Sequence, residues 1–330
     1  MNKVPFIVAE ISANHIQSYD RAERLVYAAK TAGADAVKFQ TYLADDMAAD
    51  VMIEKGPWAG QSYRELYRKA YMPWGWHKPL FELAQRLGMV AFSAPFSVQA
   101  VCFLRSLDCP MYKIASPEIM HYELIGKTAR TGKPLIISTG MASLQEIYWA
   151  SEVADTNGCK DLTFMHCISS YPAKAEDFNL NTMSRLMSHN FKVGLSDHSL
   201  DNTAVIAAVA LGATMIEKHL CLRRADGGPD AKFSLEPHEF ASMVRASRQT
   251  AAAMGDVLFG CRPAEENSYQ YRRSIWVTAP VKKGEVFSAA NTAVLRPNYG
   301  IEPNHFGMIL GKPAKVDIPA NTPFEWRFVR

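Results

Sequence analysis

Two histidines are the residues of this 330-residue chain whose type and spacing most directly suggest chemistry. His198 closes one strand-like run, Val193-Gly-Leu-Ser-Asp-His198, and His219 closes the next, Met215-Ile-Glu-Lys-His219. If both runs are parallel strands of one sheet, the crossover between them brings both imidazoles to the same edge. Two neutral imidazoles there are good ligands for a divalent metal, although two independent polar loop residues would have the same spacing.

Two lysines add a second kind of chemistry. Lys38 and Lys113 each lie near the end of an apolar run, where burial of the ammonium group is costly unless something anionic meets it. Small hydroxyl side chains follow other runs: Ser116, Ser169, Ser170 and Ser196. Two ammonium groups with hydroxyls suit a phosphate or a phosphorylated acid. Structural ion pairing of the lysines is the alternative, and a Schiff base with a carbonyl substrate is another.

Two carboxylates complete the candidate site. Glu10 and Glu118 follow the first and fourth apolar runs and are available as general base and hydrogen-bond acceptor. A metal could polarise a carbonyl as a Lewis acid while the lysines hold an anion. Together these groups predict carbon–carbon bond formation between an aldehyde and a phosphorylated enol.

The elements that must position these residues form a repeating pattern. Eight apolar runs alternate with helical stretches, and Gly often precedes the next run, as expected of a helix C-cap. The runs cover residues 6–10, 36–40, 89–93, 111–116, 134–138, 162–166, 192–196 and 213–217. Eight βα units with strands too apolar for one-sided burial predict a TIM (β/α)8 barrel over residues 1–257. Such a barrel gathers the polar strand ends on one catalytic face.

Two segments depart from the βα repeat. An insertion over about residues 43–74 carries Trp58, Tyr63, Tyr67, Tyr71 and Trp74, and either shapes a substrate pocket or is a surface flap packed by its own aromatics. After a polar linker at 258–273, residues 274–330 contain four short strand-like runs, 274–279, 282–287, 293–296 and 314–318. A module of this size is marginally stable alone, so we expect it to dock on its own barrel or on a partner subunit.

Composition excludes several classes of protein. The net charge is +3 and no Lys/Arg run is present, which argues against nucleic acid as a partner. No apolar stretch is long enough to span a bilayer, so no membrane partner is expected. The six cysteines form no CxxC motif, and the N-terminus lacks the pattern of a signal peptide. These features predict a cytoplasmic protein with reduced thiols.

Several motifs resemble those of the sialic acid synthase family across nearly the whole chain. They are Ala9-Glu10-Ile-Ser-Ala-Asn14-His15, Ala36-Val-Lys38-Phe-Gln40-Thr, Tyr112-Lys113-Ile-Ala-Ser116, Ser138-Thr-Gly-Met141, Gly194-Leu-Ser-Asp-His198, Ile216-Glu-Lys-His219 and Gly228-Pro-Asp230. The terminal module, with Leu295-Arg296-Pro297 and Gly300, resembles the antifreeze-like (SAF) domain of those enzymes. The resemblance therefore implies a TIM barrel followed by a SAF domain.

The resemblance also implies a reaction and a role for each site residue. Phosphoenolpyruvate condenses with the open-chain form of an N-acetylated amino sugar to give a nine-carbon 2-keto acid and phosphate. The implied metal is Mn²⁺ or Mg²⁺ on His198 and His219, and the implied assembly is a domain-swapped homodimer. Phosphoenolpyruvate would be held by Lys38, Lys113, Ser116 and Ser196. The sugar would contact Gln40, Tyr171 and Asp230, and also the partner subunit's Arg296. Glu10, Glu118 and His219 would be catalytic.

Within the family the chain is most similar to pseudaminic acid synthases, in stretches such as Gly56-Pro-Trp58 and Arg224-Ala-Asp226-Gly-Gly-Pro-Asp230. The implied sugar is then a 2,4-diacetamido-2,4,6-trideoxy-altrose, and a sialic or legionaminic acid synthase is the alternative. Two positions depart from the family. Asn14-His15-Ile16-Gln17 replaces Asn-His-x-Gly, which could alter a turn, and Ala94 replaces a phosphate-binding Ser or Thr, which could cost about 1 kcal/mol.

Overall fold

The computed structural model describes residues 4–56 and 58–329. The chain folds as two compact units, Met1–Asp256 and Val257–Arg330, which are taken in turn below. In the described part of the chain, no helix is both long enough and apolar enough to cross a membrane. Each of the six cysteines is a free thiol; Cys102 and Cys261 are exposed and the other four are buried.

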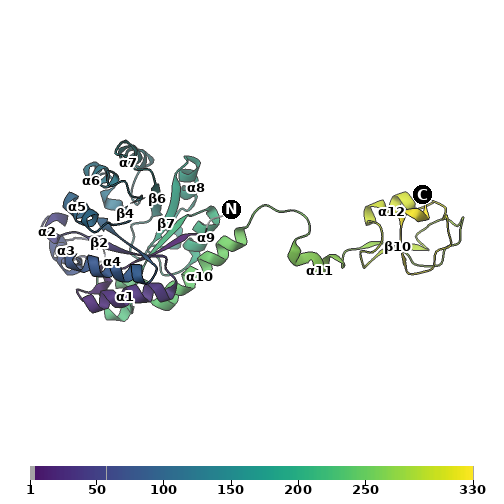
Figure 1. Cartoon of the computed structure of the whole chain (residues 1–330), viewed down its shortest axis with the longest axis horizontal. Coiled ribbons are helices and arrows are strands. Elements are labelled where there is room, and N and C mark those ends of the chain that lie inside the picture. Colours follow the sequence, from purple (N-terminus) through teal and green to yellow (C-terminus); the bar gives the residue numbers. More distant parts are fainter. Residues whose placement is uncertain (1–3, 57, 330) are drawn as a thin grey trace. The chain divides into compact units, whose positions relative to one another are not determined.

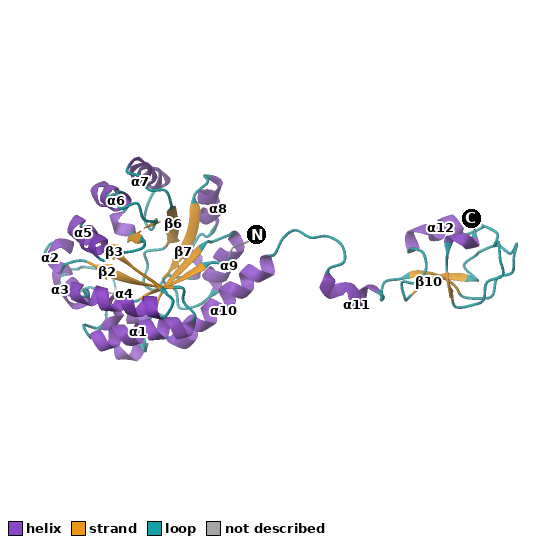
Figure 2. Ribbon diagram, in the orientation of Figure 1, coloured by secondary structure: helices purple, strands orange, loops and turns teal. Residues whose placement is uncertain are grey.

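The first unit is a closed barrel of eight parallel strands in sequence order, β1 to β8. Figure 2 shows the orange strands inside a ring of purple helices. The strands are β1 Phe6–Glu10, β2 Ala36–Thr41, β3 Val90–Pro95, β4 Tyr112–Ile114, β5 Leu135–Ser138, β6 Leu162–Cys167, β7 Lys192–Asp197 and β8 Met215–His219. The predicted TIM barrel is thus confirmed, with strand ends within two residues of the expected runs.

One long helix follows each strand and covers the barrel (Figure 1). These helices are α1 Tyr19–Ala32, α4 His77–Arg86, α5 Val98–Ser106, α6 Tyr122–Ala129, α7 Leu144–Thr156, α8 Asn181–Ser188, α9 Thr203–Leu211 and α10 Pro237–Met254. Helix α1 shows the local logic, because Ser18 accepts the Arg21 backbone N–H at its start and Gly33, at φ +91°, ends it. Single 3₁₀ turns lie in the loops: η1 Ser12–His15, η3 Ser116–Glu118, η4 Ala175–Asp177, η5 Arg224–Asp226 and η6 Ala231–Phe233.

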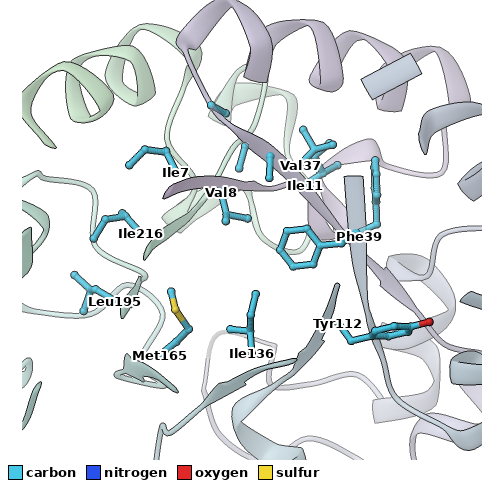
Figure 3. Close-up of a cluster of buried hydrophobic side chains, with 14 of the residues drawn as sticks. Ile7, Val8, Ile11, Val37, Phe39, Tyr112, Ile136, Met165, Leu195 and Ile216 are labelled. Atoms are coloured by element: carbon cyan, nitrogen blue, oxygen red, sulfur yellow. The ribbon is translucent and has the colours of Figure 1, made fainter. Parts of the chain in front are cut away.

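The lower part of the barrel is filled with apolar side chains. Figure 3 shows Val8, Ile136 and Met165 pointing toward the barrel axis, and all three are buried. Gly194 belongs to the same interior, because a Cβ there would lie 2.6 Å from the Met215 carbonyl oxygen. This packed layer supports the strand ends above it and places the polar side chains at the upper mouth.

The insertion between β2 and α4 is ordered into short elements. It contains α2 Ala44–Met47, α3 Tyr63–Ala70 and η2 Trp74–Trp76, and Met52 pairs with Ser62 in an isolated antiparallel bridge. Its aromatics are divided between two surroundings. Trp74 stacks on Phe103 with ring centroids 4.6 Å apart, and so packs on the body of the barrel.

The second unit has a three-stranded sheet in the order β10-β9-β11. Its elements are β9 Ser274–Val277, β10 Thr292–Leu295, β11 Thr322–Pro323, η7 Pro263–Glu265, α11 Glu266–Tyr269, η8 Pro303–His305, α12 Phe306–Ile309 and η9 Trp326–Phe328. Two of the four expected strands are wrong: 282–287 and 314–318 contribute only to the isolated bridges Val281–Ile318 and Val286–Pro313. These segments still exchange backbone hydrogen bonds, such as those between Val281 and Ile318, but Gly284 within one run and Pro313 beside the other keep them from forming a continuous ladder.

Candidate active site

Strand register brings the predicted residues to one level of the barrel mouth. Glu10 on β1 pairs with Lys38 on β2 and with His219 on β8. All three side chains are buried. Because successive residues of a strand point to opposite faces, positions that are paired in this way project together into the barrel.

Four buried charges form what we call the charged layer: Glu10, Lys38, Lys113 and Glu217. Lys38 Nζ lies 2.5 Å from Glu10 Oε2 and 3.5 Å from Glu217 Oε1. Lys113 Nζ lies 3.4 Å from the same Glu217 oxygen, which also accepts a 3.1 Å hydrogen bond from Ser196 Oγ. The layer therefore joins the two predicted anion-binding lysines through a glutamate.

Glu217 is a site residue that the sequence analysis did not predict. The usable signal is its spacing, since Glu217 and His219 are two residues apart in β8 and point to the same side. Lys218 between them points to the opposite side, where its ammonium group lies 2.7 Å from the buried Asp197 carboxylate. The alternation of β8 thus separates the face that looks into the barrel mouth from a structural ion pair.

Burial and charge oppose each other in the charged layer. Burial alone would raise the pKa of the Glu217 carboxyl, but Lys113 and Lys38 lower it to about 2. Burial dominates at Lys113 and lowers the pKa of its ammonium group despite Glu217. At Lys38 burial acts in the same direction, but Glu10 and Glu217 prevail and raise the pKa. Lys113 is therefore the cation whose charge would gain most from an additional anion.

Hydroxyl groups line the mouth beside Lys113. Ser116 Oγ accepts the Gly140 backbone N–H at 3.1 Å. The hydroxyls of Ser138 and Ser169 are buried, with no hydrogen-bond partner among the described residues, so both can donate to a ligand. Gly140 belongs to the motif Ser138-Thr-Gly-Met141, but the sequence analysis gave it no role. A Cβ there would overlap Ser169 Oγ and lie 2.8 Å from Ser116 Oγ, so the cradle has room only for glycine.

The remaining carboxylates lie around the same opening. Burial raises the pKa of Glu118 to about 7, and its Oε2 has no partner in the described chain. Gln40 Nε2 donates to Glu10 Oε1 at 3.2 Å, which places the amide next to the charged layer. The Asp230 carboxylate accepts the Ala13 backbone N–H at 3.3 Å, and burial raises its pKa.

The two histidines lie together at the mouth, with ring centroids 5.4 Å apart. His198 Nδ1 lies 3.0 Å from the Ile168 carbonyl, which can only accept, so Nδ1 carries a proton and Nε2 is the nitrogen left for a ligand. His219 Nδ1 is buried without a hydrogen-bond partner among the described residues, 4.0 Å from Asp230 Oδ2. Burial, assisted by His198, lowers the pKa of His219 well below its usual value and keeps that imidazole neutral.

Three aromatic side chains from different loops stand beside the histidines, and we call them the aromatic wall. Tyr171 after β6 lies 4.4 Å from His198, and Phe233 after β8 lies 5.0 Å from His219, measured between ring centroids. Trp58 from the insertion lies 5.5 Å from Tyr171. Within the insertion, Trp58 thus lies at the mouth, while Trp74 packs on helix α5 of the barrel and not on the insertion's other described aromatics.

Sequence models of two families match the chain: NeuB family over residues 25–258, and SAF domain over residues 272–330. The chain belongs to the NeuB family. The pseudaminic acid synthase of Helicobacter pylori is 42% identical over 98% of this chain and 97% of its own length. The N,N'-diacetyllegionaminic acid synthase of Campylobacter jejuni is 35% identical over 94% of this chain and 96% of its own.

A solved structure gives the same result. The N-acetylneuraminic acid synthetase of Leptospira borgpetersenii, solved in complex with citrate, superposes with a TM-score of 0.74 and 30% identity, covering 82% of this chain and 92% of that one. The predicted resemblance to sialic acid synthases, and the barrel followed by a SAF domain, are confirmed for this NeuB family member.

A divalent metal, which the family resemblance implies, fits the two histidines as a partial ligand set. Both rings are buried, and His219 Nδ1 lacks a protein partner in the described structure. The described residues contain no cluster of three or more metal-ligating side chains. Substrate or water oxygens would therefore have to complete the coordination, which leaves the open position that a catalytic metal needs.

Of the twelve predicted site residues, eleven lie in the first unit, and Arg296 is the exception. It lies directly after β10 in the second unit, within the SAF domain. Ala94 on β3 is buried and pairs with Gln40, so the position that often carries a hydroxyl in the family adds none here.

Proposed function

We propose that this chain is a pseudaminic acid synthase. It condenses phosphoenolpyruvate with the open-chain form of 2,4-diacetamido-2,4,6-trideoxy-β-L-altropyranose, giving a nine-carbon 2-keto sugar acid and phosphate. C3 of phosphoenolpyruvate bonds to the aldehyde carbon, the aldehyde oxygen takes up a proton, water adds to C2, and phosphate leaves. The observation that carries the proposal is a charged layer beside two buried imidazoles, in a chain 42% identical to such an enzyme.

Phosphoenolpyruvate binds above the charged layer. Lys38, Lys113, Ser116 and Ser196 hold its phosphate and carboxylate, because ammonium and hydroxyl groups are the donors that bind such oxygens, even though Glu10 and Glu217 already pair with the two lysines. A bound anion counteracts the burial that lowers the pKa of Lys113, because it stabilises the charged ammonium group. Binding of the anion is therefore favoured, because it offsets the cost of burying the Lys113 ammonium group.

The acceptor sugar lies between the histidines and the carboxylates. Gln40, Tyr171 and Asp230 contact its hydroxyl and acetamido groups. Glu118 exchanges protons at the reacting centre, since a carboxyl with a pKa of about 7 serves as acid or base near neutral pH. Glu10 accepts a hydrogen bond from Gln40 and orients it toward the sugar.

His198 and His219 hold the divalent metal, Mn²⁺ or Mg²⁺. When bound, such an ion polarises a carbonyl oxygen as a Lewis acid. Chelation should abolish phosphate release, and Mn²⁺ should restore it. Calorimetric titration of the chelated protein with Mn²⁺ should show one site that is lost in His219→Ala; unchanged binding in that variant would contradict the assignment.

The enzyme acts in the cytoplasm as a domain-swapped homodimer, in which the partner subunit's Arg296 contacts the sugar. A mixing experiment tests this arrangement. Arg296→Ala and Lys113→Met subunits should each be impaired, and random re-pairing of the two should return about a quarter of wild-type activity, because each mixed dimer contains one intact site. No recovery would show that Arg296 acts within its own chain or not at all.

A panel of acceptors tests the function itself. Phosphate release should be fastest with the 2,4-diacetamido-2,4,6-trideoxy-altrose, and slower with the legionaminic acid precursor and with N-acetylmannosamine. The legionaminic acid precursor is the second candidate substrate, because a synthase for that product is 35% identical to this chain. If either alternative sugar were turned over best, the proposed function would be wrong.

A further inference from the structure

The β1–α1 turn combines backbone strain with contacts to the insertion. Ile16 and Gln17 both adopt left-handed conformations, at φ +46° and φ +54°. Such a conformation is unfavourable for residues other than glycine, and for a β-branched residue it is a true outlier. Consecutive strained residues persist only where their surroundings stabilise them, so the contacts of these two side chains indicate what the strain supports.

Gln17 makes the decisive contacts. Its side-chain amide donates to the backbone carbonyls of Tyr71 at 2.5 Å and Lys69 at 3.3 Å, at the C-terminal end of α3. Those carbonyls have no partner within the helix, so the amide caps α3. Because α3 belongs to the insertion, Gln17 ties the insertion to the first βα turn of the barrel.

The insertion also contains Trp58, which lies beside the other two rings of the aromatic wall near the histidines. The Trp58 indole N–H donates to the Pro229 carbonyl at 3.1 Å, in the loop after β8. Ile16 packs on the same loop, since a Cβ on Gly228 would lie 3.2 Å from Ile16 Cγ1. Ile16, Gln17 and Trp58 also line one cavity of about 430 Å³. The strained turn and the tryptophan are thus parts of one assembly.

The aromatic wall offers the acceptor an apolar surface beside the metal-binding pair. Trp58 lies 6.4 Å from Phe233 and 5.5 Å from Tyr171 between ring centroids, so the three rings form a continuous patch. A methyl or acetamido methyl group packs well against such rings, whereas a hydroxyl there loses its water and gains no acceptor from them.

We propose that Trp58 is a specificity-determining residue, whose ring packs against the deoxygenated end of the acceptor sugar, and that Gln17 is the positioning residue that holds it there. The inference rests on the proposed function, because it assumes a 6-deoxy acceptor. An apolar pocket rejects an added hydroxyl only moderately, so the preference for a 6-deoxy acceptor over its 6-hydroxyl counterpart should be about ten- to a hundredfold in kcat/KM.

The first experiment compares two acceptors that differ only at C6, namely 2,4-diacetamido-2,4,6-trideoxy-altrose and its 6-hydroxyl form. In Trp58→Ala the preference should fall to less than about fivefold, with the KM for phosphoenolpyruvate unchanged. Trp58→Phe should keep part of the preference, since it retains a ring without the bond to Pro229. Trp149→Ala is the matched control, because Trp149 is 43% exposed on α7.

The second experiment separates positioning from folding. Gln17→Glu keeps the size and the strained backbone but cannot donate to two carbonyls, whereas Gln17→Gly removes the strain together with the contacts. Both should raise the sugar KM several-fold and reduce the 6-deoxy preference, with kcat and the KM for phosphoenolpyruvate near wild type. Gln17→Gly should unfold no earlier than wild type. Gln61→Glu, which changes another glutamine lining the same cavity, is the control.

The outcomes distinguish the inference from the proposed function. A 6-deoxy preference that survives in Trp58→Ala would overturn the role of Trp58, even if the wild type were confirmed as a pseudaminic acid synthase. A sugar KM unchanged in both Gln17 variants would overturn the positioning role. Best turnover of N-acetylmannosamine by the wild type would instead overturn the proposed function, and the C6 comparison in Trp58→Ala would still decide whether this ring discriminates.

Discussion

The charged layer and the aromatic wall lie beside the same two histidines but are built in different ways. Glu10, Lys38, Lys113 and Glu217 come from β1, β2, β4 and β8, and strand register sets their positions. The wall comes from the insertion, the segment after β6 and the segment after β8. Strands of a closed barrel fix a side chain more tightly than loops do, so the layer is the rigid part of the site.

Under the proposed function, this difference assigns the two halves of the reaction to two kinds of structure. Binding of phosphoenolpyruvate would then rest on strands. Recognition of the acceptor sugar, which differs between relatives whose named products differ, would rest on loops. A barrel built in this way can change its sugar by altering loops while it keeps its chemistry.

Removing a cation from the charged layer should have the largest effect. Lys113→Met should lower kcat/KM for phosphoenolpyruvate by about a thousandfold, because it deletes a donor aimed at developing and bound negative charge. It should also cost about 3 kcal/mol of stability, since Glu217 loses a buried counter-charge 3.4 Å away. Phosphate release and urea unfolding measure the two effects.

The surface variant Lys133→Met is the control for that experiment. Lys133 forms an exposed pair with Asp108 at 3.1 Å, and such pairs contribute little. If Lys113→Met changed the ranking of acceptor sugars instead of phosphoenolpyruvate binding, the division between layer and wall would be wrong.

The charged layer and the barrel could be predicted from sequence because both depend on short-range patterns. Period-two alternation and apolar runs indicate strands, and closure of the barrel then places Glu10, Lys38, Lys113 and His219 at one mouth. Glu217 was missed, although the same alternation places it beside His219. A glutamate within an apolar strand deserves the interpretation given to the lysines, because its burial also requires a partner.

The wall could be predicted only in part, because its members meet through tertiary contacts. Trp58 and Phe233 are 175 positions apart, and no local pattern pairs them. The departure at Ile16-Gln17 was recognised as a possible change of turn, but its partner in α3 was not. Similarly, the short strands of the second unit depend on pairing across Pro- and Gly-rich loops, where propensity says little.

Glu118 adds a case between the layer and the wall, because it lies in the 3₁₀ turn after β4 and is close enough to Lys113 for that cation to lower its pKa against the effect of burial. Burial raises its pKa from 4.5 to about 7, so its contribution to stability is present below pH 4.5 and is lost as the pH rises through about 7. The full effect is about 3 kcal/mol, at 1.36 kcal/mol per pKa unit. Glu118→Gln should therefore gain stability over wild type as the pH rises.

The measurement is urea unfolding at roughly pH 5 and roughly pH 8, in wild type and variant, so that other titrating groups cancel. Glu152→Gln on the exposed side of α7 is the control and should show no such trend. A stability difference that is independent of pH would mean that Glu118 is not held as a protonated acid near neutrality. Glu118→Gln should also lose activity. Loss of activity together with a gain in stability would show that the Glu118 carboxyl is kept for chemistry at the expense of stability.

Two glycine variants give the smallest expected effects and compare the halves directly. In Gly140→Ala the new Cβ overlaps Ser169 Oγ and lies 2.8 Å from Ser116 Oγ, so the hydroxyl cradle must shift. Overpacking of this kind costs about 1–3 kcal/mol. Because the clash falls on the hydroxyl cradle, we expect this cost to appear in binding, as a KM for phosphoenolpyruvate raised by about five- to a hundred-and-fiftyfold. The sugar KM should change little, because the cradle lies in the anion-binding half.

Gly75→Ala is the counterpart in the insertion. A Cβ there meets no atom within 4 Å among the described residues, and the backbone of Gly75 is not left-handed. Both KM values should therefore stay near wild type, since an added methyl in open space leaves the loop and its Trp58 in place. If Gly140→Ala raised the sugar KM as strongly as that for phosphoenolpyruvate, the two halves of the mouth would be mechanically coupled, and strands and loops would share the recognition of both substrates.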